Sequence, residues 1–212
     1  MRKNTLLLTM MIVLTATSLA FAQQKSYDLQ QLLKEKKLIT HGQKIVPLTD
    51  SGKKGIAMNG LVWLDGVEFT SGTIEVDLRG KNEFQKSFLG IAFHGVDDVT
   101  YDLVYFRPFN FTTEDSVRKI HAVQYTSNPD YTWERLRTER NGIYEKGISP
   151  APLATDWFHA RIEVKDTEIN VYVNNATTPS LTVTKLNDRK TGKIGIFNEG
   201  LDGNFANLVI RK

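Results

Sequence analysis

The sequence predicts an all-β fold, a sandwich or barrel of short strands. Apolar residues recur with a period of two in segment after segment, which is typical of strands that bury one face. Residues that favour turns separate these segments at short intervals, and helical spacing is confined to one stretch near the start of the mature chain. Many short strands with regular turns and little helix favour a packed β structure.

Residues 1–22 have the three zones of a secretory signal peptide. Arg2 and Lys3 form a positive start, Leu6–Leu19 is mainly apolar, and Ala20–Ala22 is a small-x-small cleavage site. The uninterrupted apolar part is short for a membrane anchor, and no cysteine follows that could carry a lipid. We therefore expect a bacterial-type exported protein, periplasmic or secreted, with no membrane span after cleavage.

Composition narrows the classes of partner. The chain has 212 residues, 41% hydrophobic and 24% charged, which are ordinary values for a globular protein. Loss of the two cations in the export segment would lower the net charge from +3 to +1, so no nucleic-acid partner is expected. The absence of cysteine excludes disulfides, thiolate metal sites and a cysteine nucleophile. We expect an N-terminal lead-in over 23–43 and a single domain over 44–212.

The elements follow from local patterns. A short helix is predicted over Tyr27–Lys37, where leucines have helical spacing and Asp28 can act as the N-cap. The clearest strand is Gly72–Arg79, in which apolar and polar residues alternate throughout. Further strands are predicted over Phe88–His94, Thr100–Arg107, Lys119–Tyr125, Trp157–Val164, Ile169–Val173, Leu181–Leu186, Lys193–Phe197 and Phe205–Ile210. The long irregular stretch from Ser127 to Asp156 is of the kind that often carries function.

Six segments, taken in order, resemble the concanavalin A-like lectin/glucanase superfamily and its laminin-G-like members. They are Gly72–Arg79, Phe88–His94, Asp156–Val164, Ile169–Asn174, Gly192–Phe197 and Phe205–Ile210. The terminal portion is also similar to bacterial 3-keto-disaccharide hydrolase domains. The resemblance covers most of 44–212 and implies a two-sheet antiparallel jelly-roll sandwich with a concave face where sugars often bind. It implies no reaction, because this fold hosts lectins, glycosidases and interaction modules.

Aromatic and polar residues gather in the middle of the chain and predict a site for an oligo- or polysaccharide. Sugar sites combine flat aromatic faces with groups that hydrogen-bond hydroxyls, inside a pocket with a mainly apolar lining. On the strand Thr100–Arg107, Tyr105 and Arg107 share a face, and His94 is expected on a face floored by Gly90 and Ala92. The candidate ligand-binding residues are His94, Tyr105, Arg107, Gln124, Tyr125 and Trp133. The competing interpretation is that the aromatics only pack a sheet.

A glycoside hydrolase or lyase of the same superfamily is the alternative function. Family 16 glucanases of that superfamily use a Glu-x-Asp-x-x-Glu strand, and Glu75-x-Asp77 matches it without the third acid. Catalytic residues therefore stay unassigned, with Glu134, Asp102 and His94 as the candidates for an acid pair or an acid and a histidine. A laminin-G-type protein-interaction module is the third reading, and its mark would be an exposed apolar patch without a cleft.

No metal or other cofactor is expected, with Ca²⁺ as the one ion left open. No two histidines have a spacing typical of a metal site. Asp97-Asp98 and Asp202-Gly203-Asn204 offer oxygen ligands that Ca²⁺ could use, but turn chemistry accounts for both.

Overall fold

The computed structural model describes residues 23–212, so the predicted export segment 1–22 lies outside the described residues. Its strands are β1 Gln24–Tyr27, β2 Leu38–Ile39, β3 Ile45–Asp50, β4 Lys53–Phe69, β5 Gly72–Arg79, β6 Ser87–Gly95, β7 Tyr101–Phe106, β8 Val123–Asn128, β9 Glu145–Lys146, β10 Phe158–Val164, β11 Glu168–Val173, β12 Leu181–Thr184 and β13 Gly192–Arg211. Its helices are α1 Leu29–Lys34, the 3₁₀ turn η1 Pro108–Asn110, α2 Ser116–Lys119 and α3 Trp133–Glu139.

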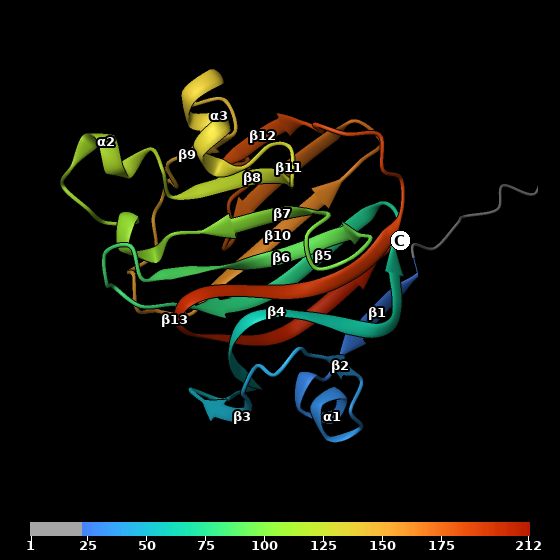
Figure 1. Ribbon diagram of the computed structural model, residues 1–212. Helices are drawn as coiled ribbons and strands as arrows, with labels where there is room; N and C mark the ends of the chain where they lie inside the picture. Colours follow the sequence, from blue (N-terminus) through green and yellow to red (C-terminus); the bar gives the residue numbers. More distant parts are fainter. Residues whose placement is uncertain (1–22) are drawn as a thin grey trace, which may run out of the picture.

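The strands form one antiparallel sheet that folds over into two packed layers (Figure 1). The order is β12-β11-β10-β5-β13-β6-β7-β8-β9, with β4 also paired along β13. The first part of β13 pairs with β6 and its last part pairs with β5, so this strand belongs to both layers. In Figure 1, β6, β7 and β8 form the front layer, with β10, β11 and β12 behind it. The expected all-β antiparallel sandwich is confirmed.

The main core lies between the two layers and follows from the alternation in the sequence. In β5, Ile74, Val76 and Leu78 are fully buried, and they meet Leu89, Ile91 and other apolar residues in one cluster. Burial of such side chains is worth about 1.5–3 kcal/mol each, which is the main driving force for this packing. The residues between them on β5 face outward, as expected for a half-buried strand.

Helix α1 forms where the leucine spacing predicts it. The Asp28 side chain accepts a hydrogen bond from Gln31 N at 3.0 Å, and Leu29 is buried against the sandwich. Strand β1 of the lead-in pairs with the last residues of β13, from Gln24 opposite Arg211 onward.

Some boundaries differ from the expectation. The strand predicted over Lys119–Tyr125 begins only at Val123, because the residues up to Lys119 form helix α2. Asp115 caps this helix by accepting hydrogen bonds from the backbone amides of Val117 and Arg118. The long strand β4 was not anticipated, and the irregular stretch after β8 contains α3 and β9. Helices α2 and α3 both lie at the rim of the front layer (Figure 1). Residues of both helices line a hollow over that layer.

No helix within residues 23–212 has the length and apolar character that crossing a membrane requires.

Candidate functional site

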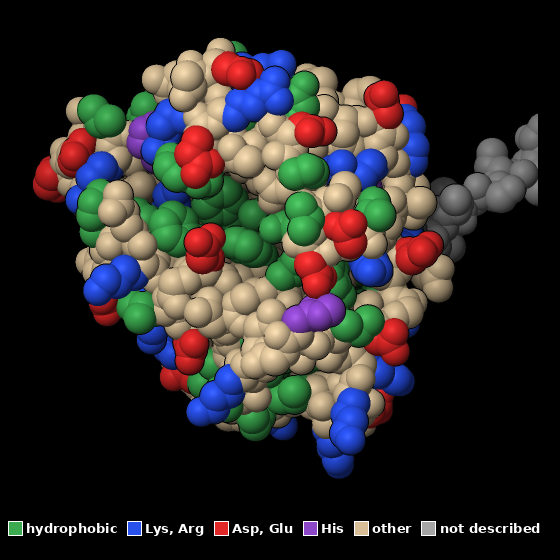
Figure 2. Space-filling model, in the orientation of Figure 1, with side chains coloured by type: hydrophobic (Ala, Val, Ile, Leu, Met, Phe, Trp, Pro, Cys, Tyr) green, Lys and Arg blue, Asp and Glu red, His purple; other side chains and the backbone are tan. Residues whose placement is uncertain are grey.

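A hollow of about 820 Å³ lies on the outer face of the front layer and is called the cleft below. Figure 2 shows this hollow with hydrophobic side chains on its floor. Its lining consists of Phe84, Gln85, Phe88, Tyr101, Leu103, Tyr105, Arg107, Phe109, Asn110, Val117, Arg118, His121, Thr126, Asn128, Thr132, Trp133, Glu134, Arg137, Phe197 and Glu199.

The floor is a second hydrophobic cluster, separate from the core between the layers. It contains Tyr101, Leu103 and Tyr105, which alternate along β7, and Phe88 and Phe197 pack beside them from β6 and β13. Alternation along β7 therefore sends one set of side chains into the core and the other into the cleft. Gly90 permits this packing, because a Cβ there would lie 2.0 Å from the Val104 carbonyl oxygen on the neighbouring strand.

A hydrogen-bonded group crosses the floor between β7 and β8. The Tyr105 hydroxyl donates to Gln124 Oε1 at 2.7 Å, and the Arg107 guanidinium donates to the Tyr105 oxygen at 2.5 Å and also to Gln124 Oε1. Burial raises the pKa of the Tyr105 hydroxyl to about 12 and lowers the pKa of Arg107. This group is a fixed set of polar atoms beneath an otherwise aromatic surface.

Helix α3 forms one wall and is held by a buried ion pair. Arg137 donates to both carboxylate oxygens of Glu145, at 3.1 and 2.8 Å, and Glu145 is almost fully buried. Burial opposes ionisation of Glu145, but Arg137 and its cationic neighbours hold the pKa of this carboxyl below its usual range. His121 Nδ1 lies 2.8 Å from Glu145 Oε2, and burial lowers the pKa of that histidine.

Two aromatic rings stand exposed at the rim. Trp133 at the start of α3 is 43% exposed, and Phe84 on the loop between β5 and β6 is 53% exposed. The Arg137 guanidinium lies 5.1 Å from the Trp133 ring centre, and Arg118 lies 4.2 Å from that of Phe84. Each ring therefore makes a cation–π contact with an arginine. This contact stabilises the position of an exposed aromatic side chain.

Four of the six predicted ligand-binding residues come together here. Tyr105, Arg107 and Trp133 line the cleft, and Gln124 lies directly beneath it, bonded to the first two. His94 and Tyr125 are not brought to the cleft, because both face the space between the layers.

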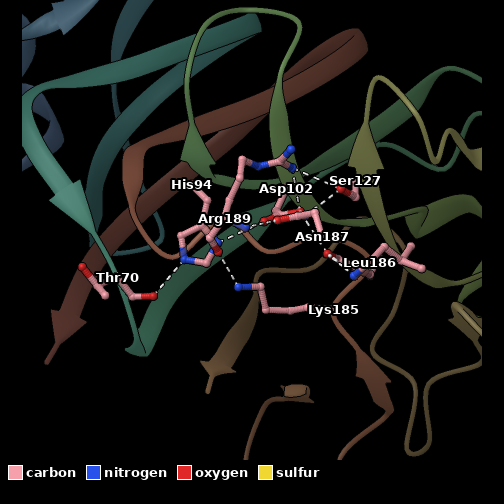
Figure 3. A network of polar contacts seen from close by, with 9 residues as sticks. Thr70, His94, Asp102, Ser127, Lys185, Leu186, Asn187 and Arg189 are labelled. Atoms are coloured by element: carbon pink, nitrogen blue, oxygen red, sulfur yellow. Dashed lines mark hydrogen bonds and ion pairs between the residues drawn. The ribbon is translucent and has the colours of Figure 1, made fainter. Parts of the chain in front are cut away.

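The prediction that His94 shares a face with Gly90 and Ala92 is wrong. His94 has a positive φ of 49°, and the pairing of β13 with β6 shifts register at this point, so the side chain leaves the Gly90 and Ala92 face. It is fully buried, 3.0 Å from Asp102 Oδ2 and 2.8 Å from the Thr70 carbonyl oxygen. Figure 3 shows this network, which Asn187 and Arg189 complete from the segment after β12.

The acidic residues divide between the faces of the sandwich. Glu75 and Asp77 lie on the outer face of β5 in the back layer, away from the cleft, where Asp77 bonds Lys53 and His159. Asp102 is buried between the layers. Glu134 and Glu199 do line the cleft. The proposed Glu-x-Asp strand therefore does not contribute to this site.

No cluster of three or more metal-ligating side chains occurs among residues 23–212. At the Asp97-Asp98 turn, Asp97 accepts from the Val99 and Thr100 amides, and Asp98 accepts from Trp63 Nε1. These contacts are turn and packing interactions.

Several cleft residues escaped sequence reasoning, among them Arg118, His121, Phe84 and Glu199. Phe84, Arg118 and His121 come from loops and from the short helix α2, where no periodicity shows which way a side chain points, and Glu199 lies at the bulge of β13, where the alternation of faces is interrupted. The available signal was their position: residues 108–121 directly follow the aromatic strand β7 and so must lie at its end.

The fold and the cleft define a class: a concanavalin A-like jelly-roll sandwich with an aromatic and polar hollow over one layer. No protein-family model matches the chain, and no curated protein matches it. Among solved structures, the chain is similar to the carbohydrate-binding module CBM66 from Bacillus subtilis, with TM-score 0.59 and 13% identity over 82% of this chain and 95% of that one. It is also similar to a Bacillus subtilis protein with a galectin-like fold, with TM-score 0.54 and 10% identity over 89% and 96%. These likenesses establish the shared fold.

Proposed function

We propose that this chain is an exported glycan-binding protein that holds an oligo- or polysaccharide in the cleft. The observation that carries the proposal is the convergence of Trp133, Tyr105 and Arg107 on one hollow, above the buried amide of Gln124. Flat aromatic faces suit the apolar side of a sugar ring, and fixed donors and acceptors suit its hydroxyls. The fold shared with a carbohydrate-binding module agrees with this role. Export is supported by the three-zone pattern of residues 1–22.

Trp133 is the residue through which the proposal is best tested. Its ring is 43% exposed and outside the buried core, so truncation should remove a contact surface without unfolding the protein. We expect Trp133→Ala to weaken glycan binding about tenfold, which corresponds to about 1.4 kcal/mol, and Trp133→Phe to retain part of the affinity. A glycan array would identify the sugar, and titration calorimetry would measure the affinities.

Ile143→Ala is the matched control, because Ile143 is 55% exposed but does not line the cleft. Its affinity should equal that of the unmodified chain. The proposal fails if the array shows no binding, or if Trp133→Ala binds as tightly as the control.

Hydrolysis of the bound glycan is the second candidate, because Glu134 and Glu199 line the same cleft. Glycosidases place two carboxyl groups on either side of the scissile bond. Chromatography of the bound glycan after incubation decides between the two functions: new reducing ends that Glu134→Gln or Glu199→Gln abolishes would indicate an enzyme. The third reading, an interaction module marked by an exposed apolar patch without a cleft, is less well supported, because the apolar residues here form the floor of a hollow and lie above a hydrogen-bonded polar group.

A further inference from the structure

One end of the cleft concentrates positive charge. Arg107 and Arg118 both line the cleft at this end, and both donate hydrogen bonds to residues of the segment 108–121. Arg107 donates to the His121 carbonyl oxygen at 3.2 Å, Asn110 donates to that same oxygen at 3.1 Å, and Arg118 Nε donates to Asn110 Oδ1 at 3.2 Å. Arg137 is linked to Arg107 through the Glu145 carboxylate, which lies within ion-pair distance of both arginines. Figure 2 shows Lys and Arg side chains on the rim beside this end of the hollow.

A single buried carboxylate serves two of these three arginines. Glu145 is bidentate to Arg137 and lies 3.5 Å from Arg107. Arg118 has no carboxylate within ion-pair distance in the part of the chain that the structure describes. Its described partners are neutral: the Asn110 amide oxygen and the Phe109 carbonyl oxygen, at 3.2 and 2.9 Å. Among the described residues, the Arg118 guanidinium is therefore left without a carboxylate partner, since Asp115, three residues earlier, uses its carboxylate to accept hydrogen bonds from the Val117 and Arg118 backbone amides.

The two other acids of the cleft do not neutralise this end. Glu199 is on β13, opposite Phe88 of β6, so it lies two strands away from β7 and Arg107. Two strand spacings are about 10 Å, too far for an ion pair. Glu134 is exposed on α3, and neither acid forms an ion pair with these arginines. Solvent screens an exposed charge of this kind strongly.

We propose that this end of the cleft binds the anionic group of an acidic sugar, a carboxylate or a sulfate, with Arg118 as its direct ligand. This rests on the glycan-binding function proposed above and narrows it to acidic glycans. A planar guanidinium matches the two oxygens of either anion and forms charge-assisted hydrogen bonds with them. Two of the five N–H donors of Arg118 are used by Asn110 and Phe109, which fixes the group, and the guanidinium carbon lies over the Phe84 ring at 4.2 Å from its centre.

The test is calorimetric titration with matched pairs of oligosaccharides. The carboxylate arm uses oligomers of galacturonate, glucuronate and alginate, each compared with its neutral methyl ester. The sulfate arm uses carrageenan oligomers compared with their desulfated forms. We expect binding of the acidic member of at least one pair to exceed that of its neutral partner about tenfold, and to weaken as salt rises from about 0.05 to 0.5 M. The arm that responds identifies carboxylate or sulfate as the anion.

Arg118→Gln should reduce the affinity for that acidic glycan about tenfold and leave the neutral partner within about twofold. Arg118→Lys keeps the charge but not the planar fork, so its affinity should be intermediate, and it serves if the glutamine variant does not fold. Arg135→Gln is the matched control, because Arg135 is an exposed arginine of α3 that does not line the cleft.

Equal binding of acidic and neutral partners, or an Arg118→Gln variant that loses both alike, overturns the acidic-sugar proposal and leaves glycan binding standing. Absence of binding to every glycan on the array and in both arms overturns the two proposals together.

Discussion

At the scale of single residues, two carboxylates singled out by their sequence context bind strands together. Asp102 Oδ1 accepts hydrogen bonds from Tyr125 at 2.9 Å and Arg189 at 3.0 Å, and its other oxygen faces His94. Asp77 accepts from His159 at 2.8 Å and from Lys53 at 2.6 Å on the outer face of the back layer. Both carboxylates are largely buried and surrounded by donors, which is how a folded protein retains a buried charge.

Asp77 should make the stability of the protein depend on pH. Burial opposes its ionisation, but hydrogen bonds from His159, Lys53 and Asn207 lower its pKa to about 2. Because the folded pKa is below the unfolded value, the stabilisation is fully present above about pH 4 and is lost as the pH falls toward 2. Asp77→Asn should lower the free energy of unfolding at pH 7 by on the order of 2 kcal/mol.

Urea denaturation at pH 7 and at pH 2.5 checks this prediction. The difference between Asp77→Asn and the unmodified chain should shrink at the lower pH. Asp130→Asn, at an exposed turn, should show no such change. A difference that is the same at both pH values would contradict the assignment.

At the scale of elements, sequence patterns predict strands better than the walls of the cleft. Alternation places β5 at its observed bounds, Gly72–Arg79, because its period is unbroken. The segments Lys193–Phe197 and Phe205–Ile210 prove to be one strand, β13. The glycines between them, such as Gly200 with a φ of 96°, form a bulge where a turn was expected. Helices α2 and α3 are too short for periodicity, so which of their residues meet the cleft depends on tertiary contacts.

Helix α3 depends on the Arg137–Glu145 pair for its position over the cleft. Glu145→Gln removes the carboxylate that compensates Arg137 and the neighbouring Arg107, and should cost about 3 kcal/mol of stability. Because Trp133 begins this helix, glycan affinity should fall as well.

A double-mutant cycle separates the pair from its surroundings. Arg137→Gln combined with Glu145→Gln should be less destabilised than the sum of the single variants, with a coupling of about 1–3 kcal/mol in chemical denaturation. The exposed pair Arg135 and Glu139 on the same helix is the matched control, and its coupling should not exceed about 0.5 kcal/mol. Additive effects at Arg137 and Glu145 would show that the pair does not anchor α3.

At the scale of the whole molecule, the cleft continues into a second hollow across the front layer. This hollow, of about 480 Å³, lies over β4 and β13 and shares Phe197 and Glu199 with the cleft. Gln43 and Asn59 are among its other lining residues. The two hollows together extend over the strands from β8 to β4, because β13 lies between β6 and β4 in the sheet. Such a surface can contact several consecutive sugars of one chain.

We therefore expect glycan affinity to rise with chain length. A monosaccharide can fill only one position, whereas a hexasaccharide of the best-binding type can contact both hollows and gain contact area in each. Gln43→Ala, which removes a polar side chain from the lining of the second hollow, should reduce the gain for the hexasaccharide and leave shorter ligands unaffected. Trp133→Ala should weaken ligands of every length, because its ring belongs to the cleft that even a short ligand occupies. Calorimetry over a length series measures both effects, and equal affinities for the mono- and hexasaccharide would restrict binding to a single hollow.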